Sequence, residues 1–269
     1  WLFGYFSYDL KNETEELTSN HYDGLGFPAL HFFQPLYVIL VSGAGVKLEY
    51  LPGKTTASEA EKLAQAIQES GTPVFSHRAI GELQARFARE EYLSTVERLR
   101  KHIRRGDIYE VTFCQEYYAC AGIDPFPVSL RLGKLSPAPF SCFYRLKDHY
   151  LMSSSPERFL SKAGNHVISQ PIKGTTRRGI SEEEDRLLKQ KLRQDVKEQA
   201  ENVMIVYLVR NDLSRTARMN SVRVDELFGI YTFPQVHQMI STVSATIRQE
   251  DHLRCIRNAF PMGCMTGPP

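Results

Sequence analysis

The chain has 269 residues, enough for one large domain or two ordinary ones, with 42% hydrophobic residues, 24% charged residues and a formal net charge of +2. This composition is typical of a globular protein, and the small net charge argues against a general affinity for nucleic acids or acidic membranes. No apolar run approaches the ~18 residues that a membrane-spanning helix needs, and the first residues lack the features of a secretory signal. The 5 cysteines include no CxxC pair, which argues against a zinc or redox site, and we expect a location in the reducing cytoplasm.

The first part of the chain is predicted to contain short strands and two helices. Glycine-rich and proline-rich breaks separate four strands, predicted over residues 2–8, 29–33, 36–41 and 46–51. Apolar residues at helical spacing predict a helix over residues 57–69 and a second over 89–105, which Gly106 is placed to end. A strand is then predicted over residues 108–121.

The second part alternates between strands and helices. Residues 142–172 have the pattern of antiparallel strands, with turns predicted at Lys147-Asp148 and Gly164-Asn165. One long helix is predicted from Ser181, which has Glu184 three residues later as in a capping box, to about residue 212. After it come strands over residues 222–224 and 236–247 and a helix over 253–260.

This order of elements predicts the fold class. The strands follow one another too directly for a doubly wound parallel sheet, and the helices are too few for a helical bundle. We therefore predict an α+β fold with large antiparallel sheets and flanking helices. The organisation expected is a strand-rich region over residues 1–85 and a second region over residues 86–269 of the same fold.

The run Pro171-Ile172-Lys173-Gly174-Thr175 is the most informative stretch for chemistry. A predicted strand ends at Ile172, and the Gly-Thr turn after it can direct backbone N–H groups and a hydroxyl toward an anion. Taken alone the signal is weak, because a single lysine at the end of a strand is more often a solvated surface charge.

Three further candidates are acidic. Glu198 and Glu201 are three residues apart in the predicted long helix, so both carboxylates lie on one face and could hold Mg²⁺, which prefers oxygen ligands. Glu157 follows Pro156, which fixes the backbone there, and could be a positioned acid. For each of them, a solvated surface carboxylate is the alternative.

The remaining candidates lie near the end of the chain. His237 precedes an alternating strand that contains Thr242, although a single histidine is more often structural than catalytic. Gly263 lies in the glycine-rich turn from Phe260 to Gly267, a second possible anion-binding turn.

Taken together and in order, these stretches resemble the chorismate-utilising family, which includes anthranilate synthase component I, aminodeoxychorismate synthase component I, and the isochorismate and salicylate synthases. The resemblance implies the fold of anthranilate synthase component I. It is carried by six segments, Gly106–Tyr109, Ser155–Phe159, Pro171–Thr175, Glu201–Val206, Arg210–Asp212 and Phe260–Gly267.

Lys173 indicates the branch of the family, because the resemblance implies a small residue there in the other members and lysine in a Pro-Ile-Lys-Gly-Thr context in aminodeoxychorismate synthases. The resemblance then implies that Lys173 adds to C2 of chorismate and that Glu157 protonates the leaving hydroxyl. It further implies Mg²⁺ on Glu201 with Glu198 nearby, and ammonia from a glutamine amidotransferase partner. The substrate contacts that it implies are Gly174, Thr175, His237, Thr242 and Gly263.

Some positions depart from the family pattern. Glu110 stands where glutamine or lysine is common, Tyr207 replaces an acidic residue, and Cys264 replaces a serine. The pattern continues past Gly267 with further substrate and Mg²⁺ residues, so the C-terminal part of the pattern is expected to be absent from this sequence, which ends at Pro269. The alternatives left open are an anthranilate synthase component I, a catalytically inactive chorismate-binding subunit, and fusion to a lyase domain.

Overall fold

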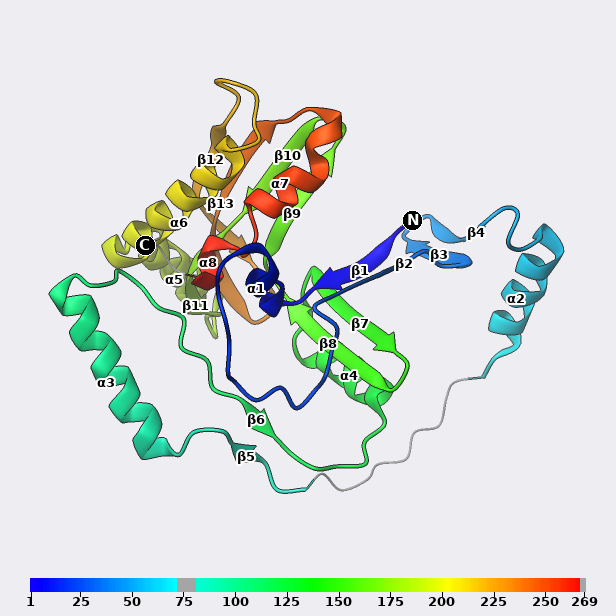
Figure 1. Ribbon diagram of the computed structural model, residues 1–269, viewed down its shortest axis with the longest axis horizontal. Helices are drawn as coiled ribbons and strands as arrows, with labels where there is room; N and C mark the ends of the chain where they lie inside the picture. Colours follow the sequence, from blue (N-terminus) through cyan, green and yellow to red (C-terminus); the bar gives the residue numbers. More distant parts are fainter. Residues whose placement is uncertain (72–80, 267–269) are drawn as a thin grey trace. The chain divides into compact units, whose positions relative to one another are not determined.

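The computed structural model describes residues 1–71 and 81–266. The chain divides into two compact units, Trp1–Ser76 and His77–Pro269 (Figure 1). Within the described residues, every helix is too short or too polar to cross a membrane.

The first unit consists of two antiparallel strand pairs and a well-capped helix. Strand β1 pairs with β2, and β3 pairs with β4; their bounds are Phe3–Phe6, Leu30–Phe33, Tyr37–Ser42 and Gly45–Tyr50. A 3₁₀ turn over Tyr8–Leu10 and the short helix α1, Lys11–Thr14, follow β1. Helix α2, Ala57–Glu69, begins with a reciprocal capping box between Thr56 and Glu59. The four strands and the helix predicted here are confirmed.

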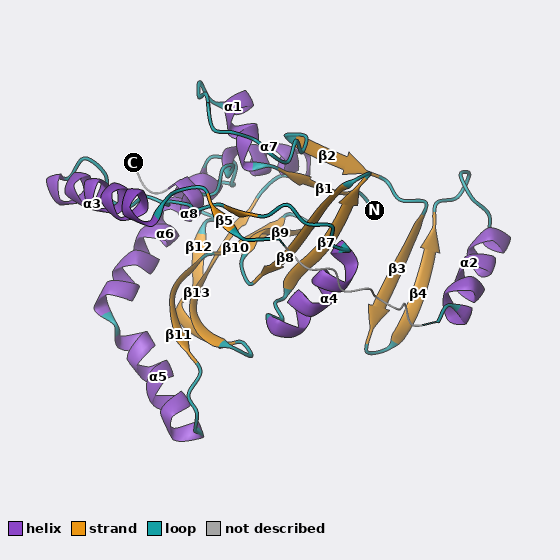
Figure 2. Ribbon diagram, turned by 90° about the horizontal axis from the view of Figure 1, so that it is seen from below, coloured by secondary structure: helices purple, strands orange, loops and turns teal. Residues whose placement is uncertain are grey.

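The second unit is built on a five-stranded antiparallel sheet (Figures 1 and 2). Strand β13 is its centre: β12 pairs along one side, β10 and β11 pair one after the other along the opposite side, and β9 pairs with β10. The strands run over Arg158–Ala163 (β9), His166–Gln170 (β10), Ile172–Arg177 (β11), Arg223–Thr232 (β12) and Val236–Thr246 (β13). The predicted α+β class with a large antiparallel sheet is confirmed.

Other antiparallel pairs in this unit are smaller. Strands β7, Phe140–Leu146, and β8, His149–Ser155, form a hairpin whose turn places Lys147 at a φ of 53°. The turn between β9 and β10 places Gly164 at a φ of 58°, a conformation that glycine adopts without strain. Both turns lie where the sequence predicted them.

Two helices cover one face of the sheet, and Figure 2 shows α5 and α6 on the same side of it. They run over Glu182–Gln194 and Val196–Ser214, so the prediction of one continuous helix was wrong. The chain leaves the helical conformation at Asp195, whose carboxylate accepts the N–H groups of Lys197 and Glu198 and so caps α6.

The core of the unit lies between α6, the sheet and α7, His252–Asn258. Its fully or nearly fully buried residues are apolar: Val167, Val206, Leu213, Val243, Ala245, Ile247 and Cys255. The order of these elements along the chain thus brings helix α6 against strands β11 and β13, which carry most of the candidate residues.

Helix α3, Arg89–Arg105, ends at Gly106 with a φ of 79°, as predicted. The predicted strand over residues 108–121 was wrong: it contains only β6, Tyr117–Tyr118, paired with β5, Gln84–Ala85. Residues that favour strands need a partner strand, and only this short stretch has one. Helix α4, Pro125–Leu135, was not predicted, although Asp124 as N-cap followed by Pro125 is a helix-start signal.

Candidate active site

Lys173 lies at the start of β11, where the pairing of β11 with β13 shifts register between Ile172 and Thr175. The side-chain amide of Asn202 on α6 donates to the carbonyl oxygens of Lys173 and Met239, each at 3.4 Å. Asn202 is 1% exposed and accepts the Ser241 hydroxyl at 2.5 Å. A buried amide thus holds the irregular part of β11 against β13.

The Lys173 side chain forms an ion pair with Glu110. Its Nζ lies 2.6 Å from Oε1 of Glu110, and each side chain is 22% exposed. Glu110 belongs to the irregular segment after α3, so residues 63 positions apart meet at one point. In the sequence Glu110 stands out only as a departure from the family pattern, and nothing in its neighbours along the chain indicates the contact with Lys173.

Glu157 lies beside the same strand. The backbone N–H of Ile172 donates to Glu157 Oε1 at 3.2 Å. The carboxylate is therefore fixed next to the residue that precedes Lys173, and Glu110 and Glu157 approach this part of β11 from two separate segments of the chain.

Gly174 brings the strand close to the predicted metal carboxylates. Its φ is +95°, and a Cβ added there would lie 3.2 Å from both Cβ and Oε2 of Glu198 and 3.3 Å from Cβ of Met239. A side chain at position 174 would be strained and crowded, which explains the glycine. The predicted anion-binding turn and Glu198 are thus direct neighbours.

Glu198 and Glu201 each form an ion pair with the same lysine, Lys197. Lys197 Nζ lies 3.7 Å from Glu198 and 3.1 Å from Glu201, and the two glutamate side chains are 24% and 36% exposed. The described residues contain no group of three or more His, Cys, Asp or Glu suited to a metal. Two carboxylates on one helix face still fit Mg²⁺, which takes one or two carboxylates and completes its shell with water and substrate oxygens.

His237 is part of a buried polar cluster. Its ring is 0% exposed, with Nε2 2.9 Å from Asp185 Oδ1 and Nδ1 3.1 Å from Thr232 Oγ1. The Asp185 carboxylate also accepts Arg178 and the N–H of Gly179, which hold the pKa of Asp185 well below its usual range. Because both ring nitrogens have protein partners, the geometry favours the structural alternative for this histidine.

Thr175 and Thr242 lie on strands that pair with one another. Thr175 is opposite Gln238, and the Thr242 hydroxyl accepts from Gln170 at 3.1 Å. Oε1 of Gln238 is buried without a hydrogen-bond partner among the described residues. Gln238 is not among the residues predicted for the site, and its only signal in the sequence is its position next to His237.

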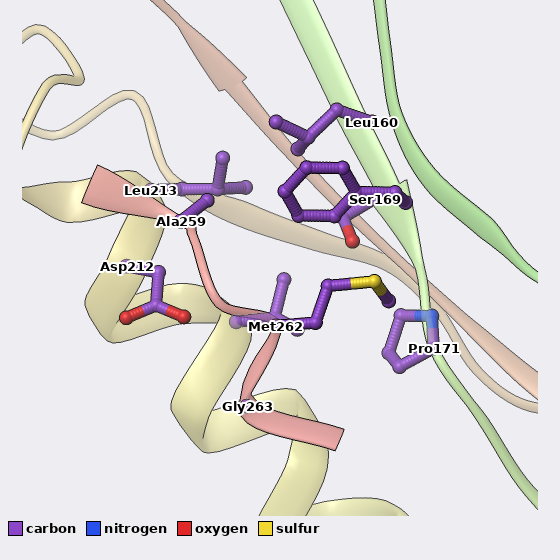
Figure 3. Close-up of a pocket in the computed structure, with 10 residues that line it drawn as sticks. Leu160, Ser169, Pro171, Asp212, Leu213, Ala259, Met262 and Gly263 are labelled. Atoms are coloured by element: carbon purple, nitrogen blue, oxygen red, sulfur yellow. The ribbon is translucent and has the colours of Figure 1, made fainter. Parts of the chain in front are cut away.

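Gly263 lies in the wall of a small pocket of about 20 Å³ (Figure 3). The pocket is mostly apolar and is lined by residues of β9, β10, α6 and the segment after α7: Phe159, Leu160, Ser169, Pro171, Val209, Asp212, Leu213, Ala259, Met262 and Gly263. Asp212 contributes a carboxylate, and burial raises its pKa to about 6 against the opposing effect of Arg215. Gly267, the last residue of the predicted turn, lies outside the described residues.

The second unit therefore brings several predicted residues to one region. Lys173, Gly174 and Thr175 on β11 have Glu157 and Glu198 as neighbours, and Thr242 lies on the adjoining strand β13. Gly263 lies on a pocket that also includes Pro171, while His237 faces Asp185. An amine and two carboxylates, those of Glu157 and Glu198, lie around one strand, and such a set is suited to a substitution reaction on an anionic substrate.

Known proteins with similar sequences are enzymes, several of which are named for chorismate chemistry. The sequence model described as chorismate binding enzyme matches residues 1–269. The anthranilate synthase component 1 of Thermus thermophilus is 34% identical over 275 residues, 100% of this chain and 60% of that protein. The aminodeoxychorismate synthase component 1 of Escherichia coli is 38% identical over 187 residues, 69% of this chain and 41% of that protein.

A solved structure shows the same fold. The crystal structure of anthranilate synthase component I from Streptococcus pneumoniae matches with a TM-score of 0.85 and 26% identity, over 100% of this chain and 62% of that one. The chain thus spans less than two thirds of the length of these relatives. It has the fold of anthranilate synthase component I and belongs to the family of chorismate binding enzymes.

Proposed function

We propose that this chain forms the chorismate-using part of an aminodeoxychorismate synthase, which converts chorismate and ammonia to 4-amino-4-deoxychorismate for p-aminobenzoate and folate synthesis. The observation that carries the proposal is the position of the Lys173 amine at the start of β11. Its Nζ contacts Glu110, and the backbone N–H of the preceding residue, Ile172, donates to Glu157. A lysine so placed can act as a nucleophile. Relatives from Klebsiella aerogenes and Escherichia coli that are named aminodeoxychorismate synthase component 1 are 40% and 38% identical to it.

In the proposed reaction the Lys173 amine adds to C2 of chorismate, and the C4 hydroxyl departs as water with a proton from Glu157. Ammonia then adds at C4 and displaces the lysine nitrogen from C2. Two substitutions by good nucleophiles replace one difficult substitution. Glu157 accepts the backbone N–H of Ile172, the residue before Lys173, and this position supports its proposed role as the acid.

Mg²⁺ is proposed to bind Glu201 and Glu198, where it would hold a carboxylate of the substrate. The N–H of Gly174 and the hydroxyl of Thr175 are proposed to contact a carboxylate as well, and Thr242 and Gly263 to line the pocket. The contact of Gly174 with Glu198 supports this arrangement, since it joins the anion-binding turn to the metal carboxylates. His237 is proposed to support β13 beside the pocket through Asp185.

Ammonia is proposed to come from a glutamine amidotransferase partner. The relatives from Thermus thermophilus and Escherichia coli are each named component 1, which indicates a second component for those proteins. Activity of this protein with ammonium chloride but not with glutamine, restored by an added amidotransferase, would support the partner.

An anthranilate synthase component I is the second candidate. It is favoured by the relative from Thermus thermophilus, which is similar over the whole of this chain, and by the match to the Streptococcus pneumoniae structure. Lys173 in its Pro-Ile-Lys-Gly-Thr context favours the first candidate.

The test is product identification after incubation of the intact protein with chorismate, MgCl₂ and ammonium chloride. Chromatography with absorbance and mass detection separates 4-amino-4-deoxychorismate from anthranilate and isochorismate. We expect the first product. Anthranilate would support the second candidate, and calorimetric binding of chorismate without any turnover would indicate an inactive binding subunit.

A further inference from the structure

The ion pair between Lys173 and Glu110 bears on how the proposed nucleophile becomes active. Only a neutral amine can attack, and a free lysine with a pKa near 10.4 is neutral to ~0.04% at pH 7. In the substrate-free protein the Glu110 carboxylate lies 2.6 Å from Nζ and accepts its N–H. The pair as it stands in the substrate-free protein is therefore unreactive, and the proton on Nζ needs an acceptor.

We propose that Glu110 is this acceptor: it holds Lys173 as an ammonium before substrate binds and takes its proton when substrate covers the pair. This inference rests on the proposed function and assigns Glu110 a role in the step that precedes attack. Glu110 is in direct contact with the atom that must lose the proton, so the transfer needs no intervening water or movement of the chain.

Burial by substrate supplies the driving force. Each partner is 22% exposed, so both charges keep some contact with water. A substrate that covers them removes this solvation, and the cost of desolvating two full charges is several kcal/mol per ion. Transfer of one proton converts the ion pair into a neutral amine and a neutral carboxylic acid, which avoids most of that cost.

The neighbouring carboxylates are less suited to this task. Oε1 of Glu157 accepts the Ile172 N–H, and Glu157 is needed in its protonated form as the acid. Glu198 lies against Gly174 and is 3.7 Å from Lys197. Among the described residues, the ion pair to Lys173 Nζ comes from Glu110.

The protons balance over one cycle. Lys173 ammonium and Glu110 carboxylate become amine and carboxylic acid. The amine adds to C2, the C4–O bond breaks, and water leaves with the Glu157 proton, which leaves the lysine nitrogen as a secondary ammonium. Ammonia adds at C4 while the C2–N bond breaks, so the product carries an ammonium group and Lys173 leaves as a neutral amine. Glu110 returns its proton to Lys173, and solvent reprotonates Glu157.

Two measurements on the intact protein test this role. The first is kcat with chorismate, MgCl₂ and ammonium chloride for the wild type, Glu110→Gln, Glu110→Asp and Glu116→Gln. Glu116 is the matched control, because it lies in the same segment and pairs with Arg86 rather than with Lys173. The second is the rate of Lys173 acetylation by acetic anhydride at pH 7 without substrate, followed by peptide mass spectrometry relative to Lys191.

We expect Glu110→Gln to lower kcat by about 100-fold or more, the range of general-base catalysis, while Glu110→Asp retains more activity than Glu110→Gln. Lys173 in Glu110→Gln should be acetylated faster than in the wild type, because its amine is no longer held by the Glu110 carboxylate. Glu116→Gln should match the wild type in both measurements.

A Glu110→Gln variant with faster acetylation and undiminished kcat would overturn the proposal and leave Glu110 as a counter-ion only. Unchanged acetylation would also overturn it, because the pair would not exist in solution. Circular dichroism verifies folding, and a misfolded Glu110→Gln leaves Glu110→Ala to decide: recovery of kcat on addition of formate supports proton acceptance, and kcat equal to the wild type without formate opposes it. Failure of the proposed function is distinct, since the wild type would then form no 4-amino-4-deoxychorismate.

Discussion

Nε2 of His237 lies 2.9 Å from Oδ1 of Asp185, and this contact joins the central strand β13 to the first turn of α5. Asp185 also accepts Arg178 and the N–H of Gly179, so one carboxylate fixes a helix start, a strand and the segment between β11 and α5. His237, which the family resemblance implied as a substrate contact, thus has both ring nitrogens bonded to groups of the protein.

Asp185→Asn should lower the stability of the second unit. The pKa of Asp185 in the folded state lies below the ordinary value of 3.8, so the wild-type carboxylate contributes stability above about pH 4 and loses it as the pH falls further. Urea unfolding measures the free energy of unfolding of wild type and variant. The difference between the two proteins should be large at pH 7 and smaller at pH 3. Glu182→Gln, an exposed change in the same helix turn, is the control, and an equal effect of the two substitutions would contradict the assignment.

Gly174→Ala should disturb both stability and activity. A residue other than glycine at a φ of +95° is strained, and the added Cβ would lie 3.2 Å from Glu198. We expect a loss of about 1–3 kcal/mol in the free energy of unfolding together with weaker Mg²⁺ binding. Gly133→Ala, in the interior of α4 with nothing within 4 Å of the new Cβ, should be neutral or stabilising.

Local signals in the sequence sufficed for most of the fold. Glycine and capping residues marked the end of α3 and the start of α5, and alternation marked the strands of the sheet. The break at Asp195 was missed because the apolar spacing continues across it, whereas a single capping side chain decides where α5 ends and α6 begins. The segment over 108–121 was mispredicted because strand formation depends on a partner that only the tertiary fold supplies.

The candidate site was predictable only in part. The run around Lys173 and the spacing of Glu198 and Glu201 are local patterns, so the sequence pointed to them. The ion pair of Lys173 with Glu110 spans 63 positions, and the pocket around Asp212 combines four separate segments. Such contacts depend on how the elements pack, and no spacing along the chain indicates them.

Asp212→Asn should stabilise the protein at neutral pH. Burial raises the folded-state pKa of Asp212 to about 6 from 3.8, so the folded protein retains this proton to higher pH than the unfolded chain does. Stability therefore falls as the pH rises from about 4 to about 6, and the penalty is complete above that range. The asparagine variant should lack this dependence and gain about 1–2 kcal/mol at pH 7, less than the full equivalent of the pKa shift because Asp212 is partly exposed and its charge is screened by solvent. Thermal unfolding between pH 4 and pH 8 measures the dependence of stability on pH, and the exposed Asp225→Asn is the control. Parallel stability curves for wild type and Asp212→Asn would refute the prediction.

Lys173→Ala should abolish formation of 4-amino-4-deoxychorismate while leaving chorismate binding measurable. Loss of the proposed nucleophile removes the proposed covalent route, whereas the carboxylates proposed to bind Mg²⁺ and the turn at Gly174 remain. Product chromatography gives the rate and calorimetry gives the affinity. Lys191→Ala on the exposed side of α5 is the control. Full activity in the Lys173 variant would exclude the lysine mechanism.

Lys197 should compete with Mg²⁺ for the proposed metal carboxylates. Its Nζ lies 3.1 Å from Glu201 and 3.7 Å from Glu198, and Glu201 in particular raises the pKa of Lys197, which therefore stays charged at neutral pH. A cation entering this site must displace the ammonium. Lys197→Ala is thus expected to tighten Mg²⁺ binding by about 2- to 5-fold, in keeping with the small free energy of an exposed ion pair, and Glu201→Gln to weaken it. Calorimetric titration with MgCl₂ in the presence of chorismate compares both with Lys191→Ala. Weaker binding in Lys197→Ala, or unchanged binding in Glu201→Gln, would place the metal on other residues.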